Sequence, residues 1–246
     1  MAQADWASLV GSIAEAASFR AGVTGGVTGP PVTAPDTNLF VFGWHALEPP
    51  TAAPGGQLAH GKYCTVTDFG PTDRGIRIEG AIKRGLSASP EGFSPFLFAG
   101  LQGDSTADQC YMLGLSDEDP CKIVLRKGYL YSGVPAVATG NNLRHSVGTV
   151  LNDVWTHLRL DLITNENGDV VLACYRNDLT ANNVDAPSWV LVPFNDTLGE
   201  SYVDDVLGHN SGAIPLIGGR AGFGCEFSAA GSRAFVDHCR VLRQTA

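Results

Sequence analysis

The densest group of side chains that could do chemistry is an acidic run near the middle of the chain. It consists of Asp117, Glu118 and Asp119, directly before Pro120. Carboxylate and amide oxygens are hard ligands of the kind that Ca²⁺ takes. A second group of oxygen donors comprises Asn182, Asn183 and Asp185. Neither group has the ligand spacing of an EF-hand loop, and acidic turns are common without metal. We therefore predict no metal and no other cofactor. If a metal did bind, the acidic run Asp117, Glu118 and Asp119 would be the candidate ligands.

The spacing of the carboxylates does not suit acid and base catalysis. Glycoside hydrolysis needs two convergent carboxylates, and residues two apart share one face of a strand. Glu118 has adjacent acidic neighbours, which would point to opposite faces, and the following proline marks a turn. Glu79 stands alone between Arg77 and Lys83, so we expect it on a solvated strand face. No G-x-S-x-G, Walker-type or HExxH motif occurs, so we predict no catalytic residues and no enzyme activity.

The cysteines are spread widely along the chain. They are Cys64, Cys110, Cys121, Cys174, Cys225 and Cys239. Their separations match no compact disulfide scaffold, and no C-x-x-C motif or Cys/His pair at zinc-ligand spacing occurs. We expect mostly unpaired, buried thiols, as is usual for chains folded in a reducing compartment. The alternative is a bond between Cys225 and Cys239, which could face each other across a terminal hairpin.

Charge and composition exclude two classes of partner. The 246 residues carry 16 Lys and Arg against 25 Asp and Glu, a formal net charge of −9, with no basic stripe to neutralise a phosphate backbone. We therefore expect no nucleic-acid partner. The apolar stretches are far shorter than the roughly 18 residues of a membrane span, so we expect no membrane partner. The first residues lack the pattern of a signal peptide, so we expect synthesis in a cytoplasm.

Residues 1–35 differ in composition from the rest and are treated as an N-terminal arm. Residues 5–20 place an apolar stripe at helical spacing, which predicts a short amphipathic helix. The stripe consists of Trp6, Leu9, Val10 and Ile13. Residues 21–35 are rich in Gly, Thr and Pro, which predicts an extended linker. Such an arm needs a surface to pack on, so we expect it to engage other copies or other subunits of an assembly. The alternative is an arm wrapped on its own domain.

Residues 36–246 show the short strands and frequent turns of one antiparallel β domain. The 30 glycines and 14 prolines favour turns over long helices. The strongest local signal is a hairpin, in which leucines alternate with polar residues, an Asn-Gly turn follows and a second strand returns. It covers residues 154–162 and 170–175, with Leu158, Leu160 and Leu162 facing the core. We predict a second hairpin from residues 221–227 and 234–242.

These two segments resemble hairpins of a known superfamily. The first contains Trp155, His157, Gly168 and Tyr175 in the order of the W-x-H hairpin of laminin-G and concanavalin A-like lectin domains. The second, residues 221–242, is similar to the closing hairpin of these domains, with Asp237 at its acidic position. The resemblance covers residues 75–246 and implies a concanavalin-like jelly-roll β-sandwich. Within it, Trp155 and Asp237 are expected to be structural.

The resemblance also bears on activity. Enzymes of this superfamily hydrolyse or eliminate polysaccharides, but the E-x-D-x-x-E motif of its glucanases and the Q-I-H motif of its alginate lyases are absent. His157 and Tyr175 fall on opposite arms of the hairpin, and we expect His157 at a surface or half-buried. The aromatic residues that could stack on a sugar are Trp44, Tyr63, Tyr129 and Tyr131. Aromatic rings at alternating positions also serve sheet packing.

Three functions follow from these features as hypotheses. We expect a non-enzymatic structural and binding subunit of a large assembly. By analogy this is a bacteriophage virion protein of the tail, the baseplate or the capsid decoration, located in the virion and anchored by its arm. The alternative is a carbohydrate-binding module that recognises a surface glycan. A polysaccharide lyase or hydrolase is the third hypothesis, and it requires two titratable groups in one groove.

Overall fold

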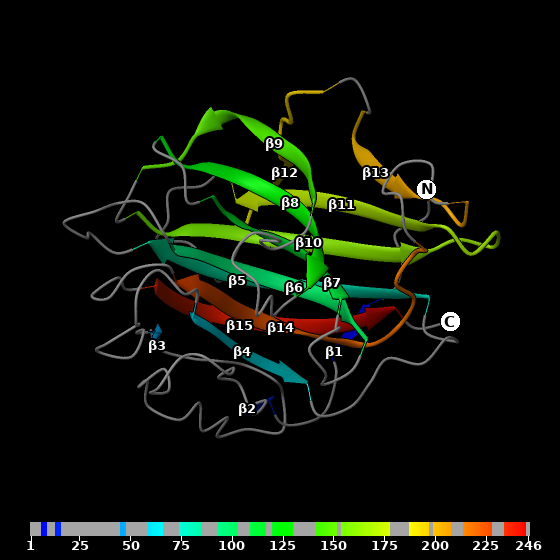
Figure 1. The fold of residues 1–246 in the computed structure, drawn as a ribbon, viewed down its shortest axis with the longest axis horizontal. Coiled ribbons are helices and arrows are strands. Elements are labelled where there is room, and N and C mark those ends of the chain that lie inside the picture. The colour runs from blue at the N-terminus through cyan, green and yellow to red at the C-terminus, as the bar shows by residue number, and fades with distance from the viewer. Residues whose placement is uncertain are drawn as a thin grey trace.

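The computed structural model describes the strands of the chain and several connecting turns. The described residues are 6–8, 13–15, 45–47, 59–65, 74–84, 93–102, 109–116, 120–129, 141–151, 154–177, 187–196, 199–207, 214–227 and 234–244. They form two antiparallel sheets stacked face to face (Figure 1). The predicted all-β sandwich is confirmed. No helix occurs within these ranges, and so none that could span a membrane.

The sheets contain eight and seven strands. The eight-stranded sheet has the order β1-β15-β5-β10-β11-β12, with β3 paired to β15 and β13 paired to β11. Its strands are β1 (Trp6–Ser8), β3 (His45–Leu47), β5 (Gly75–Arg84), β10 (Thr156–Thr164), β11 (Val170–Asn177), β12 (Trp189–Leu191), β13 (Ser201–Asp204) and β15 (Ala234–Gln244). The seven-stranded sheet has the order β2-β4-β14-β6-β7-β8-β9. Its strands are β2 (Ile13–Glu15), β4 (Ala59–Thr65), β6 (Phe93–Leu101), β7 (Gln109–Leu115), β8 (Lys122–Tyr129), β9 (Asn141–Thr149) and β14 (Arg220–Phe227).

The predicted hairpin is formed by β10 and β11. Leu158, Leu160 and Leu162 are fully buried in the core between the sheets, as their alternation predicts. The turn needs a residue in the left-handed region, and Gly168 supplies it with a φ of 85°. The side-chain oxygen of Asn165 accepts hydrogen bonds from the backbone N–H groups of Asn167 and Asp169, both at 2.9 Å. The turn therefore fixes the register that places the leucines inward.

The predicted C-terminal hairpin is wrong. β14 belongs to the seven-stranded sheet and β15 to the eight-stranded sheet, where β15 pairs with β5. The two strands lie over one another across the sandwich (Figure 1). Phe223 of β14 and Val241 of β15 enter the same core from opposite sides. Alternation shows which residues of a strand are buried but not which strand is its partner, and two facing sheets give the same pattern as a hairpin.

The predicted N-terminal helix is also wrong where the chain is described. β1 pairs with β15, with Trp6 opposite Gln244, and β2 pairs with β4, with Ile13 opposite Thr65. An isolated helix of this length is marginal in water, whereas the edge strands offer unpaired backbone N–H and C=O groups. In this chain both strands pair with strands of the sandwich domain. Leu9 and Val10 lie outside the described residues, as do the side chains of Trp6 and Ile13.

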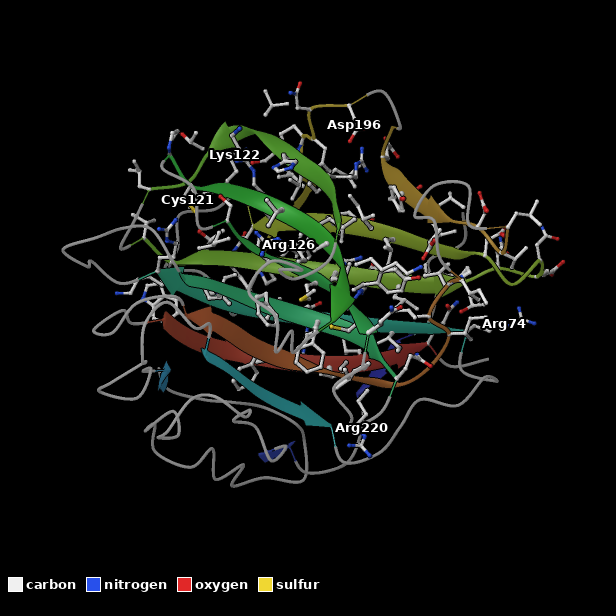
Figure 2. The ribbon with its side chains drawn as sticks, in the orientation of Figure 1. Arg74, Cys121, Lys122, Arg126, Asp196 and Arg220 are labelled. Atoms are coloured by element: carbon white, nitrogen blue, oxygen red, sulfur yellow. The ribbon has the colours of Figure 1, made fainter. Side chains whose placement is uncertain are left out.

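The segment that follows β12 crosses from the eight-stranded sheet to β9, the edge strand of the seven-stranded sheet. The N–H of Val147 in β9 donates to the carbonyl of Pro193, and the N–H of Asn195 donates to the carbonyl of His145, both at 2.8 Å. Arg144 makes a bidentate ion pair with Asp196, at 2.7 and 2.8 Å. Figure 2 shows Asp196 in the segment between β12 and β13, beside β9. Residues after β12 therefore link the eight-stranded sheet to the edge of the seven-stranded one.

A buried polar cluster ties the sheets together at one end of the core. Asp204 of β13 accepts a hydrogen bond from the hydroxyl of Tyr111 in β7 and pairs with the ammonium of Lys127 in β8 at 2.6 Å. The Tyr111 hydroxyl accepts from the N–H of Leu216 at 2.9 Å, and Lys127 donates to the carbonyl of Ile214 at 2.9 Å. Burial raises the pKa of Tyr111 and the hydrogen bond to Asp204 acts in the same direction, so the phenol remains a donor.

The thiols whose side chains are described agree with the prediction. Cys121, Cys174 and Cys239 are buried free thiols. Burial raises the pKa of Cys174 and of Cys239, so neither forms a reactive thiolate at neutral pH. Because Cys239 is a free thiol and β14 and β15 lie in different sheets, the alternative of a bond between Cys225 and Cys239 is wrong.

Candidate functional site

The residues proposed from sequence as a binding site are largely outside the described part of the chain. This holds for Trp44, Tyr131, Asp117, Glu118, Asp119, Asn182, Asn183 and Asp185. Tyr63 lies in β4 and Tyr129 in β8, but their side chains are not described. Within the described ranges no group of three His, Cys, Asp or Glu side chains is arranged to hold a metal. The candidate site therefore comes from residues that the sequence did not single out as a group.

The outer face of the eight-stranded sheet carries a continuous set of polar and aromatic side chains. The residues of β10 that alternate with the core leucines point away from the core, and the register places their partners on β5 and β11 on that same face. We call this set the polar face. It comprises Arg77, Glu79, His157, Arg159, Asp161, Tyr175, Asn177, Trp189 and Arg240.

One row of the polar face runs across five strands. Arg240 of β15 lies opposite Glu79 of β5, and Glu79 lies opposite Arg159 of β10. Arg159 lies opposite Tyr175 of β11, which lies opposite Leu191 of β12. Within this row Arg240 makes an ion pair with Glu79, and the guanidinium of Arg159 packs on the ring of Tyr175.

In the next row, Asp161 of β10 lies opposite Arg77 of β5. Arg77 donates to its two carboxylate oxygens at 2.7 and 2.8 Å, from Nε and Nη2. Arg159 donates to the same two oxygens at 2.9 and 2.5 Å, again from Nε and Nη2. Two bidentate, charge-assisted pairs on one buried carboxylate hold both guanidinium groups in fixed planes. The polar face is therefore preorganised at its centre.

Aromatic rings surround Arg159. Its guanidinium carbon is 4.3 Å from the centroid of the Tyr175 ring and 5.8 Å from that of Trp189, within the range of cation–π contacts. The ring of His157 packs on Trp189 with centroids 4.7 Å apart. Nδ2 of Asn177 lies 3.5 Å from Nδ1 of His157. Tyr175 and Trp189 are half-buried, so each ring is held by its neighbours while part of it remains at the surface.

Two expectations about this face need revision. Glu79 was expected to be solvated, but it is buried and its Oε2 accepts from Nε of Arg240 at 3.1 Å. The partner comes from β15, far along the chain, so local sequence could not show it. His157 was expected at a surface or half-buried, but it is buried against Trp189. Trp155 is half-buried under Lys83, whose ammonium is 5.3 Å from its ring centroid, which agrees with a packing role. The side chain of Asp237 is not described.

The electrostatics of the face suit binding better than proton transfer. Burial raises the pKa of Tyr175, Asp161 and Glu200 act in the same direction, and Arg159 and Arg77 oppose them. The phenol is therefore protonated at neutral pH, where it can donate a hydrogen bond. Asp161 is engaged by two guanidinium groups and Glu79 by a third. The face presents hydrogen-bond donors and ring surfaces to solvent, while its carboxylates lie beneath them.

Comparison with known proteins gives structural similarity only. No family model matches the sequence, and no curated protein matches it. The metal-free carbohydrate recognition domain of Emp46p has a TM-score of 0.47 and 13% identity, over 81% of this chain and 82% of that one. The carbohydrate-binding module CBM66 from Bacillus subtilis has a TM-score of 0.41 and 7% identity, over 99% and 98%. Alginate lyase Aly36B has a TM-score of 0.36 and 10% identity, over 82% and 81%.

Proposed function

We propose that the chain is a carbohydrate-binding module and that the polar face binds the glycan. The observation that carries the proposal is the grouping of Tyr175 and Trp189 around Arg159 on one half-exposed sheet face. Aromatic rings give apolar surface to the CH groups of a sugar ring, and guanidinium and amide groups donate to its hydroxyls. The face supplies both kinds of contact within two neighbouring rows.

Preorganisation supports this function further. Arg159 is fixed by Asp161 on one side and by the ring of Tyr175 on the other, so little side-chain entropy remains to be lost on binding. His157 and Asn177 support Trp189 in the same way. A face whose donors and rings are held before the ligand arrives is suited to recognition, and the protonated Tyr175 is one of these donors. We therefore propose binding without turnover.

A glycan array probed with the full chain tests the proposal. Tyr175→Ala and Trp189→Ala should each weaken binding of the best glycan about tenfold or more, because truncation of a central aromatic anchor costs at least about 1.4 kcal/mol. Val203→Ala is the control, since Val203 is an exposed residue of β13 in the same sheet. A wild-type chain that binds no glycan, or folded variants that bind as wild type does, would contradict the proposal.

The role of an assembly subunit stays a prediction. The described parts of the arm, β1 and β2, pair with strands of their own chain, which gives no support to a clasp between neighbours. A virion location has no support from these pairings either. Glycan binding and assembly are compatible, since a subunit of an assembly can present a binding face.

A further inference from the structure

We infer that the glycan bound by the polar face is acidic, with carboxylate groups that contact Arg159 and Arg240. This inference rests on the proposed function and names its ligand class. It follows from the depth of the charged groups, because the carboxylates of the face are more deeply buried than its guanidinium groups. This observation is separate from the grouping of the aromatic rings.

The carboxylates of the face are inside and the guanidinium groups are outside. The side chains of Asp161 and Glu79 are 5% and 6% exposed. Those of Arg159, Arg77 and Arg240 are 14%, 16% and 37% exposed. A ligand approaching from solvent therefore meets the cationic ends of the pairs, and the negative charges that balance them lie underneath.

The exposed carboxylate of Glu200 also acts on Tyr175 of this face. The preference for an acidic ligand therefore depends on the guanidinium groups of Arg159 and Arg240 themselves and not on the net charge of the face.

The geometry of Arg159 suits a carboxylate. Its Nε and Nη2 are engaged by Asp161, and its plane is fixed 4.3 Å from the Tyr175 ring. Within the described residues its Nη1 makes no hydrogen bond, so this group can donate to a ligand. A guanidinium donates to carboxylates through charge-assisted hydrogen bonds, which are about twice as strong as those to neutral hydroxyls. An acidic sugar thus gains more from this donor than a neutral one.

The experiment compares matched pairs of ligands. A panel of uronic-acid oligosaccharides with different linkages is titrated against the full chain, each beside its own methyl ester, which keeps the sugar backbone and removes the charge. The acids should bind about tenfold or more tightly than their esters. The difference should shrink at about 1 M salt, where the Debye length is about 3 Å.

Variants separate a specific contact from general charge. Arg159→Gln and Arg240→Gln should weaken binding of the acids about tenfold and change binding of the esters little. Arg176→Gln is the matched control, because Arg176 is an exposed residue of the same strand as Tyr175 and alternates to the opposite face. It should leave the affinity for the acids within about twofold. Thermal melting of each variant checks that it is folded.

The outcomes distinguish the two proposals. If esters or neutral glycans bind as tightly as the acids, the acidic ligand is excluded and the carbohydrate-binding function stands. If Arg176→Gln weakens binding of the acids as much as Arg159→Gln does, the proposed contact with Arg159 is excluded. If no acid, ester or neutral glycan binds, the proposed function itself is excluded. Preference for the acids that disappears in Arg159→Gln and Arg240→Gln supports both.

Discussion

The tie between the sheets at Asp204 can be tested by changing one carboxylate to an amide. In Asp204→Asn the ammonium of Lys127, whose side chain is 4% exposed, loses a carboxylate 2.6 Å away. Removing one partner of a buried ion pair costs about 3–5 kcal/mol, because the other charge is left uncompensated. The carbonyl of Ile214, 2.9 Å from Nζ, still accepts a hydrogen bond, so we expect the lower part of this range, about 3–4 kcal/mol.

The loss should be visible by heat and by denaturant. For a chain of this length each kcal/mol lowers Tm by about 2–4 °C, so Tm should fall by about 6–16 °C. Urea unfolding followed by tryptophan fluorescence gives the free energy of unfolding directly. Since a domain is stable by only about 5–15 kcal/mol, the effect is a large fraction of the total.

The control is the same substitution at the next residue. Oδ1 of Asp205 accepts a hydrogen bond from the N–H of Leu207 at 3.0 Å, which an amide oxygen retains, so Asp205→Asn should cost less than about 1 kcal/mol. Combining Asp204→Leu with Lys127→Met should recover most of the loss, because an apolar pair leaves no buried charge. If Asp204→Asn costs no more than Asp205→Asn, the cluster does not stabilise the sandwich and the reasoning is refuted.

Two further predictions concern the core. Leu160→Ala should cost about 2–5 kcal/mol in urea unfolding, because Leu160 is fully buried between the sheets, and a cost below about 1 kcal/mol would contradict its place there. Tyr202→Phe should leave stability at neutral pH unchanged or raise it, because the buried Tyr202 hydroxyl makes no hydrogen bond within the described residues. Burial, and then Asp204 and Asp205, raise the pKa of Tyr202 from 10.0 to about 12. The unfolded state therefore loses this proton first, and the stability present below about pH 10 falls as the pH rises toward 12. Tyr202→Phe should reduce that alkaline loss, and an unchanged pH profile of Tm would exclude this contribution.

The candidate site could be predicted only in its parts. The alternation in β10 showed that His157, Arg159 and Asp161 share a face opposite the leucines. The sequence did not show that Trp189 lies beside these residues, because the segment between Tyr175 and Trp189 has no periodic pattern. The pairing of Asn177 in β11 with Trp189 in β12 places the Trp189 ring on this face. A signal that could have found the site is the aromatic residue at each end of this connection.

The sequence by itself determined the class of fold, the faces of its strands and the β10–β11 hairpin. These depend on residues close together in the chain, since alternation with period two and the Asn-Gly turn are local properties. The tertiary structure decided the partners of strands that are far apart. It placed β14 and β15 in different sheets, turned the expected helix of the arm into β1 and β2, and brought Arg77 to Asp161 over 84 residues of sequence. Pairing between distant strands depends on which edges and faces remain to be satisfied when the whole sandwich forms, and no local pattern records that.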